Sequence, residues 1–213
     1  MFNKLEIEQK IAEYLLQIKA IKLQPENPFT WASGWKSPIY CDNRIALSHP
    51  PIRTYIRQQL VALIQEEFGP INLIAGVSTA GIPQGVLVAQ ELGLPFIYVR
   101  SKPKEHGRSN LIEGEYFEGQ RVVVIEDLIS TGGSSLQTVA ALRAAKLNVA
   151  GLVAIFSYQL KIALENFTNA NCKFATLSNY DALIKYASNH NLIQLSDLDL
   201  LRKWKISPET WQQ

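Results

Sequence analysis

Two adjacent carboxylates, Glu126 and Asp127, follow an apolar run and could bind the vicinal hydroxyls of a sugar or a hydrated magnesium ion. Residues 128–135 come next and read Leu-Ile-Ser-Thr-Gly-Gly-Ser-Ser. Their two glycines allow a tight turn that brings backbone N–H groups close to a ligand. A helix expected to begin at Ser134 offers unpaired N–H donors and a positive dipole end. The segment therefore predicts a phosphate site, with the acids directed at another part of the same ligand.

The loop glycines, Gly132 and Gly133, do not belong to the commoner phosphate-binding motifs. A Walker loop would need a lysine followed by Ser or Thr, and a dinucleotide fingerprint would need Gly-x-Gly-x-x-Gly; both are absent here. The plain alternative is a glycine turn with a serine cap between a strand and a helix. The acid pair, together with Ser130 and Thr131 before the glycines, favours the phosphate site.

A second group of chemically capable residues lies in the basic segment 100–108, Arg-Ser-Lys-Pro-Lys-Glu-His-Gly-Arg. It opens a stretch of about 20 residues before the next expected strand, and loops of that length often act as active-site lids. Its cations and histidine suit a leaving diphosphate, whose negative charge grows as the bond breaks. The alternatives are a solvated basic loop or a nucleic-acid patch.

The elements that would hold these residues alternate between strands and helices. Apolar runs predict strands at 73–77, 96–99, 122–125 and 152–156, separated by helices at 82–92 and 134–146. This alternation predicts an α/β fold with a parallel sheet and helices on both faces. Ligands of such sheets bind beyond the carboxyl ends of the strands, where the acid pair and the basic segment both lie.

The two ends of the chain differ from this central part. Helical periodicity covers 4–21, and residues 24–49 are rich in aromatics, proline and serine and read as turns with short extended pieces. A second helix is expected to begin after Ser48 as its cap, with prolines at 50 and 51, and to end at Gly69. From residue 160 onward the pattern is helical, with one short strand near 173–176.

The length of 213 residues suits one domain. We divide it into an N-terminal helix and hood (1–49), a core (50–160) and a C-terminal helical extension (161–213). A net charge of +2 does not indicate nucleic-acid binding, and no apolar run is long enough to span a membrane. The two cysteines, Cys41 and Cys172, lack metal-ligand spacing and fit a reducing cytoplasm.

The segment from the acid pair to Ser134 closely resembles the phosphoribosyl-diphosphate signature of the type I phosphoribosyltransferases. The resemblance implies that the acids hold the ribose hydroxyls, with magnesium bound nearby through substrate and water, and that 131–134 hold the 5-phosphate. The residues implied to bind phosphoribosyl diphosphate are Arg100, Lys104, His106, Glu126, Asp127, Leu128, Ile129, Ser130, Thr131, Gly132, Gly133 and Ser134.

A narrower resemblance is to the orotate phosphoribosyltransferases. Arg100, Lys104 and His106 match the catalytic loop of that family, and residues 29–44 resemble its base-binding hood. Residues 76–81, Gly-Val-Ser-Thr-Ala-Gly, resemble its loop on the diphosphate side. The resemblance also implies a homodimer in which the loop of one subunit closes over the active site of the other, so that Lys104 and Asp127 of one site come from different chains.

This sequence departs from the family pattern at four positions. Ser101, Ala32 and Ala80 stand where many members have lysine, and Tyr158 stands near the place of an arginine. The carboxylate of orotate would therefore need another partner. Ser130 is carried over from the family as a base contact, and we assign the missing cation to Arg44, whose guanidinium could hold a carboxylate at two points. A surface arginine after a turn is the alternative.

These observations predict transfer of ribose 5-phosphate from phosphoribosyl diphosphate to orotate, giving orotidine 5′-phosphate and diphosphate in de novo UMP synthesis. The catalytic residues would be Lys104, His106, Arg100 and Asp127, with Mg²⁺ as the cofactor. Two alternatives stay open: a transferase of the same fold for another base, and a non-catalytic regulator. A regulator would be expected to carry a DNA-binding helix pair or to lack the loop lysine, and the sequence shows neither feature.

Overall fold

The central element of the computed structural model is a six-stranded sheet; residues 3–31, 33–102 and 111–211 are described. Its strand order is β10-β9-β8-β5-β6-β7. Neighbouring strands are parallel, except that β7 runs antiparallel to β6. The strands are β5 (Leu73–Val77), β6 (Phe96–Val99), β7 (Ile112–Glu113), β8 (Arg121–Ile129), β9 (Asn148–Ser157) and β10 (Phe174–Asn179).

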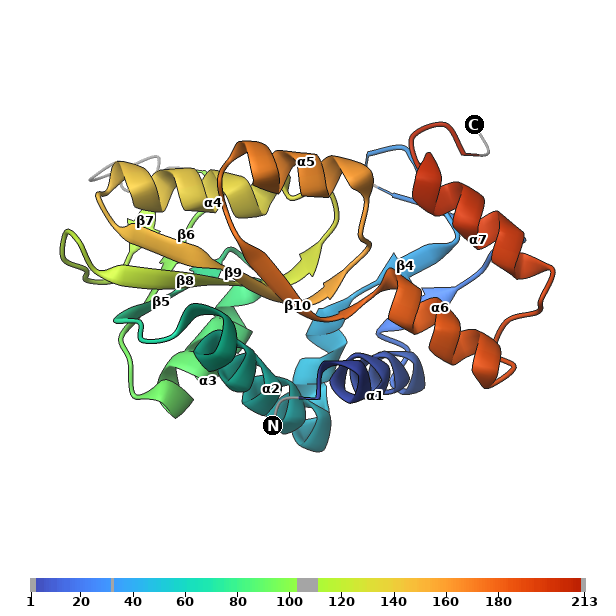
Figure 1. The fold of residues 1–213 in the computed structure, drawn as a ribbon, viewed down its shortest axis with the longest axis horizontal. Coiled ribbons are helices and arrows are strands. Elements are labelled where there is room, and N and C mark those ends of the chain that lie inside the picture. Colours follow the sequence, from blue (N-terminus) through green and yellow to red (C-terminus); the bar gives the residue numbers. More distant parts are fainter. Residues whose placement is uncertain (1–2, 32, 103–110, 212–213) are drawn as a thin grey trace.

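Helices cover both faces of this sheet, as Figure 1 shows. One face carries α4 (Gly133–Ala144) and α5 (Lys161–Asn169), and the other carries α1 (Lys4–Gln17), α2 (Pro50–Phe68) and α3 (Gly81–Leu92).

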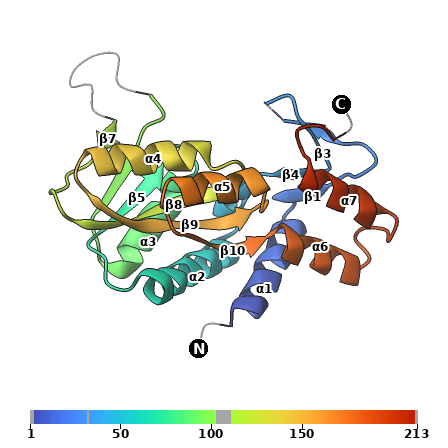
Figure 2. The same ribbon diagram turned by 45° about the horizontal axis from the view of Figure 1, so that its top comes forward.

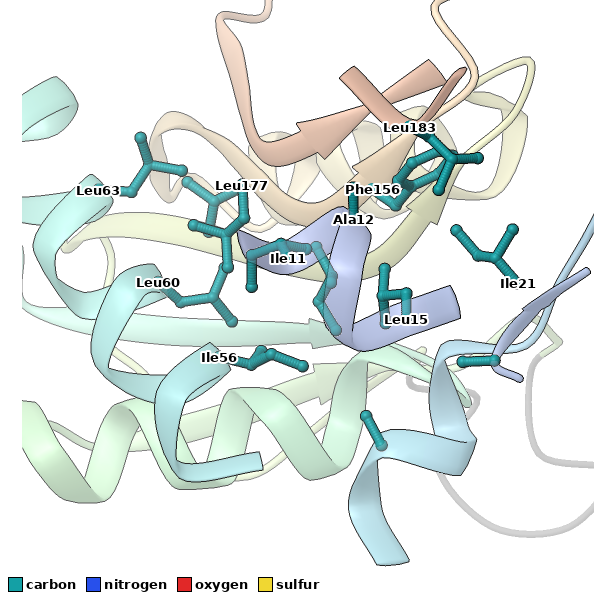
Figure 3. Packing of buried hydrophobic residues seen from close by; sticks show 14 of the residues in the cluster. Ile11, Ala12, Leu15, Ile21, Ile56, Leu60, Leu63, Phe156, Leu177 and Leu183 are labelled. Atoms are coloured by element: carbon teal, nitrogen blue, oxygen red, sulfur yellow. The ribbon is translucent and has the colours of Figure 1, made fainter. Parts of the chain in front are cut away.

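Side chains alternate between the faces along each strand, and this alternation divides the core in two. Val122 and Val124 join the core under α4 and α5, whereas Val123 and Ile125 join the core under α1 to α3. Figure 3 shows part of this second core, where Ile11 lies among side chains of α2 and of the sheet.

Two small antiparallel sheets form the N-terminal hood. β1 (Ile21–Leu23) pairs with β4 (Ile39–Cys41), and β2 (Phe29–Thr30) pairs with β3 (Lys36–Ser37). The 3-10 helix η1 (Asn43–Ser48) then leads to α2. After β10, α6 (Tyr180–Asn189) and α7 (Asp197–Ile206) complete the chain, and α7 lies beside the hood (Figure 2).

The α/β sheet with helices on both faces is confirmed. β5 and β6 have the bounds predicted for them. β8 and β9 are longer at both ends than the strands predicted at 122–125 and 152–156. β10 begins at Phe174 and runs to Asn179, further than the predicted strand. Among the described residues, no helix is long and apolar enough to cross a membrane.

Three predictions near the chain's turns are wrong. The first helix ends at Gln17, since Lys19 has a φ of 57° and Ile21 pairs with Cys41 in the hood. Ser48 does not cap α2; it is the last residue of η1, and His49 precedes the helix without a side-chain cap bond. The long loop after β6 contains β7, because Ile112 is half-buried and packs against the core under α4.

Gly151 allows β9 to pass close to α2 and to the chain before β10. A Cβ atom at this position would lie 2.2 Å from Phe68 Cε1 and 2.6 Å from the carbonyl oxygen of Lys173. Both distances are below any real carbon contact, so an added methyl group must displace the ring and the neighbouring backbone. The closeness of α2 to the sheet therefore depends on this glycine.

Gly151→Ala should lower the free energy of unfolding by about 1–3 kcal/mol, the usual cost of an overpacked core. Urea denaturation would measure it. Gly133→Ala is the matched control, because the nearest atom to its added Cβ, Thr131 Oγ1, is 3.9 Å away and alanine favours a helix. Equal stability of the two variants would contradict the close contact at Gly151.

Candidate active site

The sequence predicted that the acid pair follows the end of a strand. In the structure the pair lies inside the last part of β8. Glu126 pairs with Ala154 of β9 and is 4% exposed, and Asp127 is half-buried. β8 continues to Ile129 before the loop begins. The carboxylates are therefore fixed by a central strand of the sheet, and residues 130–132, the loop predicted to bind phosphate (the phosphate loop), follow the end of that strand.

Hydrogen bonds hold the carboxylate of Glu126 and the backbone of Asp127. Ser135 Oγ donates to Glu126 Oε2 at 3.2 Å, and the backbone N–H of Asp127 donates to Glu126 Oε1 at 3.0 Å. Asn43 Nδ2 in the hood donates to the carbonyl oxygen of Asp127 at 2.7 Å. The Ser135 hydroxyl thus orients the Glu126 carboxylate.

Burial sets the electrostatics of this pair. It raises the pKa of Glu126 well above its ordinary value, and the charge of Asp127 raises it further. Burial also raises the pKa of Asp127, and the positive charge of Arg44 partly offsets this rise. Two such neighbours share protons and titrate together, so both ionise most readily when hydroxyl donors or a cation face them.

The phosphate loop is held from α5. Gly132 adopts a left-handed φ of 82°, and a Cβ there would lie 2.7 Å from the Phe167 ring. Asn166 Nδ2 donates to the carbonyl oxygen of Thr131 at 3.0 Å. α4 begins at Gly133, so its first N–H groups, which have no partner inside the helix, belong to the loop. This arrangement is the one expected for phosphate binding.

The loop predicted to lie on the diphosphate side, residues 78–80, also approaches the acid pair closely. It follows β5, contains a cis peptide between Ser78 and Thr79, and enters α3 at Gly81. A Cβ at Gly81 would lie 2.3 Å from the carbonyl oxygen of Ile125, the residue before Glu126. Only glycine allows this contact between α3 and β8.

Arg100 is brought to the same edge of the sheet. Its N–H donates to the carbonyl oxygen of Leu111 at 2.8 Å, and its Nη1 lies 3.4 Å from Glu113 Oε1. Arg100, Ser78 and Ser134 line one pocket of about 540 Å³. The first residue of the basic segment thus faces the same cavity as the start of α4, whereas Lys104 and His106 lie outside the described residues.

Arg44 is near the acid pair, but its guanidinium is already engaged. Nε donates to Asp42 Oδ1 at 2.6 Å and Nη2 donates to Asp42 Oδ2 at 2.9 Å, which lowers the pKa of Asp42. The Arg44 side chain is 61% exposed. A ligand carboxylate would have to share or replace this ion pair, so Arg44 remains a prediction as a base contact.

Sequence reasoning missed Asn43, which is 1% exposed and joins the hood to Asp127 across 84 positions of the chain. No local pattern marks an asparagine for such a contact. Among the described residues, no group of three His, Cys, Asp or Glu side chains could hold a metal ion. The adjacent pair supplies too few ligands to hold a metal ion by itself, and it fits a cation carried by substrate oxygens and water.

Comparisons with known proteins agree with this geometry. Residues 47–182 match the phosphoribosyl transferase domain family. An orotate phosphoribosyltransferase of Phocaeicola vulgatus is 53% identical over 206 residues, covering 97% of each chain. Another, from Porphyromonas gingivalis, is 54% identical over 201 residues, covering 94% of this chain and 96% of its own.

Solved structures show the same fold. The UMP synthase of Leishmania donovani superimposes with a TM-score of 0.77 and 26% identity over 93% of this chain, which spans 42% of that protein. The orotate phosphoribosyltransferase of Aeropyrum pernix, 23% identical, gives 0.74 over 86% of this chain and 99% of its own. With about half of its residues shared with relatives along nearly the whole length, this chain belongs to the orotate phosphoribosyltransferase family.

Proposed function

We propose that this protein transfers ribose 5-phosphate from phosphoribosyl diphosphate to N1 of orotate, forming orotidine 5′-phosphate and diphosphate in the synthesis of UMP. The observation that carries the proposal is the Glu126–Asp127 pair in β8, with Glu126 buried and Asp127 half-buried, followed by a short loop and a helix that begins at Gly133. Carboxylates accept hydroxyl hydrogens and the helix start attracts phosphate, so the two together fit a ribose 5-phosphate.

The acid pair and the loop would divide the substrate between them. Glu126 and Asp127 accept hydrogen bonds from the ribose hydroxyls, while residues 130–134 surround the 5-phosphate. Magnesium bound with the diphosphate would sit near the acids through water and substrate oxygens, where it supplies charge neutralisation. As the bond to diphosphate breaks, the sugar becomes oxocarbenium-like, and the nearby carboxylates stabilise the positive charge.

The leaving diphosphate would be met by Arg100, Lys104 and His106. The position of Arg100 on a pocket shared with Ser134 supports this role, since both ends of the activated sugar must be held at once. Lys104 and His106 would neutralise or protonate the departing oxygen. Exclusion of water over the site would prevent hydrolysis of the activated sugar.

The base would lie under the hood, against Ser130. Arg44 is our candidate for the orotate carboxylate, and its closeness to Asp127 supports a place at the edge of the site. An assay with magnesium phosphoribosyl diphosphate and a panel of bases tests the proposal. We expect that only orotate is consumed. Consumption of another base would favour a transferase for that base, and consumption of none would favour a non-catalytic regulator.

Asp127→Asn should cut turnover about a hundredfold, because the site loses a charge aimed at the ribose. The same substitution should not lower the free energy of unfolding. Burial raises the pKa of Asp127 in the folded protein above its value in the unfolded chain. Ionisation of this carboxyl group therefore destabilises the folded protein as the pH rises through the interval between the two pKa values. The amide carries no such charge.

Urea unfolding of Asp127→Asn at pH 7 should therefore show equal or higher stability than the wild type, and any gain should vanish below about pH 4. Asp199→Asn, which changes an exposed acid on α7, is the control and should alter neither the turnover nor the stability to urea. Near-normal turnover of Asp127→Asn would remove the role assigned to this carboxylate.

Arg44→Ala should raise the Michaelis constant for orotate much more than that for phosphoribosyl diphosphate, by about tenfold for the lost ionic contact. Initial-rate kinetics with each substrate varied in turn would measure both constants. Arg202→Ala, which also removes an exposed arginine paired with an aspartate, should leave both unchanged. Unchanged constants in Arg44→Ala would make Arg44 a surface residue.

We further propose a homodimer with shared active sites, in which Lys104 of one subunit serves the site that holds Asp127 of the other. If inactive Lys104→Ala and Asp127→Asn chains are mixed and exchange subunits, about half of the dimers become mixed. Each mixed dimer then has one site with both wild-type residues, so activity should return to about a quarter of the wild-type value. No recovery despite demonstrated exchange would reject shared sites.

A further inference from the structure

The C-terminal helix α7 reaches the hood through one tryptophan. Trp204 is fully buried, and its Nε1 donates to the carbonyl oxygen of Lys36 on β3 at 3.1 Å. These residues are 168 positions apart in sequence, and Figure 2 shows α7 alongside β3. A buried indole N–H needs an acceptor, and here the backbone of the hood supplies it.

Trp204 also belongs to a cluster of aromatic rings that we define as Trp31, Tyr158, Tyr180 and Trp204. The Trp204 ring lies 5.7 Å edge-on from both Trp31 and Tyr158, and Trp31 lies 5.0 Å from Tyr158. Tyr180 of α6 lies 5.2 Å from Trp204, and its hydroxyl donates to the carbonyl oxygen of Leu201 on α7. Rings at such distances attract one another beyond their area of burial.

The cluster connects the hood with the end of β8. Trp31 Nε1 donates to the carbonyl oxygen of Ile39 on β4, so this ring also braces the sheet formed by β1 and β4. Tyr158 follows β9, and its N–H donates at 3.1 Å to the carbonyl oxygen of Ile129, the residue before Ser130. Tyr158 is 2% exposed. The distance from the hood to Ser130 is thus spanned by packed rings.

The phosphate side of the site has separate support. Thr131 and Gly132 contact α5 through Asn166 and the Phe167 ring, and neither contact involves the aromatic cluster. Loosening the cluster should therefore displace the hood without displacing the phosphate loop.

We propose that Trp204 is a positioning residue for the base: α7 holds the hood at the separation from Ser130 that orotate requires. This inference rests on the proposed function and assigns a role to the C-terminal extension. The hood sheets are too small to be stable alone, since they have two strands of two or three residues each. Without Trp204 they would sample positions that do not bind the base.

The test is Trp204→Leu, with both substrates varied in turn. We expect the Michaelis constant for orotate to rise about tenfold or more, that for phosphoribosyl diphosphate to stay within about twofold, and turnover at saturating orotate to be largely kept. Trp204→Phe keeps a ring but loses the bond to Lys36, so its constant for orotate should fall between those of the wild type and Trp204→Leu. It also serves as the readout if the leucine variant does not fold.

Trp211→Leu is the matched control. It removes a buried tryptophan from the same extension, and within the described part of the chain Trp211 takes no part in the four-ring cluster. Its thermal midpoint should fall while both Michaelis constants stay within about twofold. Equal changes in the two leucine variants, or an unchanged orotate constant in Trp204→Leu and Trp204→Phe, would overturn the positioning role.

Failure of this inference differs from failure of the proposed function. If the wild-type protein does not consume orotate, the proposed function is wrong and the inference falls with it. If the wild type is active and the tryptophan variants keep its orotate constant, only the inference is rejected.

Discussion

The burial of two adjacent carboxylates at the edge of a parallel sheet constrains the rest of this structure. Removing one ionised carboxylate from water costs several kcal/mol unless donors surround it. Here Glu126 receives a hydroxyl and a backbone N–H, and Asn43 holds the backbone of Asp127. Gly81 lets α3 approach the same stretch of β8. Burial raises the pKa of both carboxyl groups, and the charge of Asp127 raises that of Glu126 further, so hydroxyl donors or a cation on a ligand would favour the ionised forms.

The site also illustrates how a small substructure can be held by distant parts of a chain. Two hood sheets of two short strands each gain their order from packing: Asn43 joins them to β8, and Trp204 joins them to α7. The phosphate loop is braced by α5 instead. Because the hood and the loop have separate supports, a change that displaces one of them need not displace the other.

Much of the fold could be predicted because period-two and apolar runs report burial directly. β5 and β6, buried within the sheet, lie where their patterns indicated. The errors fell where two structures bury the same side chain equally well. Ile21 continues the helical spacing of the first segment, yet it is buried in β1, and nothing local distinguishes the two outcomes. The same holds for β7, whose two residues gain a partner only when β6 lies beside them.

The local chemistry could be predicted from the residues alone: two acids before a glycine turn and a helix start indicate a phosphate and sugar site, since the backbone physics of that turn is local. Tertiary structure decided which groups support it. Asn43 and Trp204 act across 84 and 168 positions, and the Ser135 hydroxyl donates to Glu126. Such contacts depend on how the hood and α7 pack, and packing is settled by the summed burial of many side chains rather than by any short pattern.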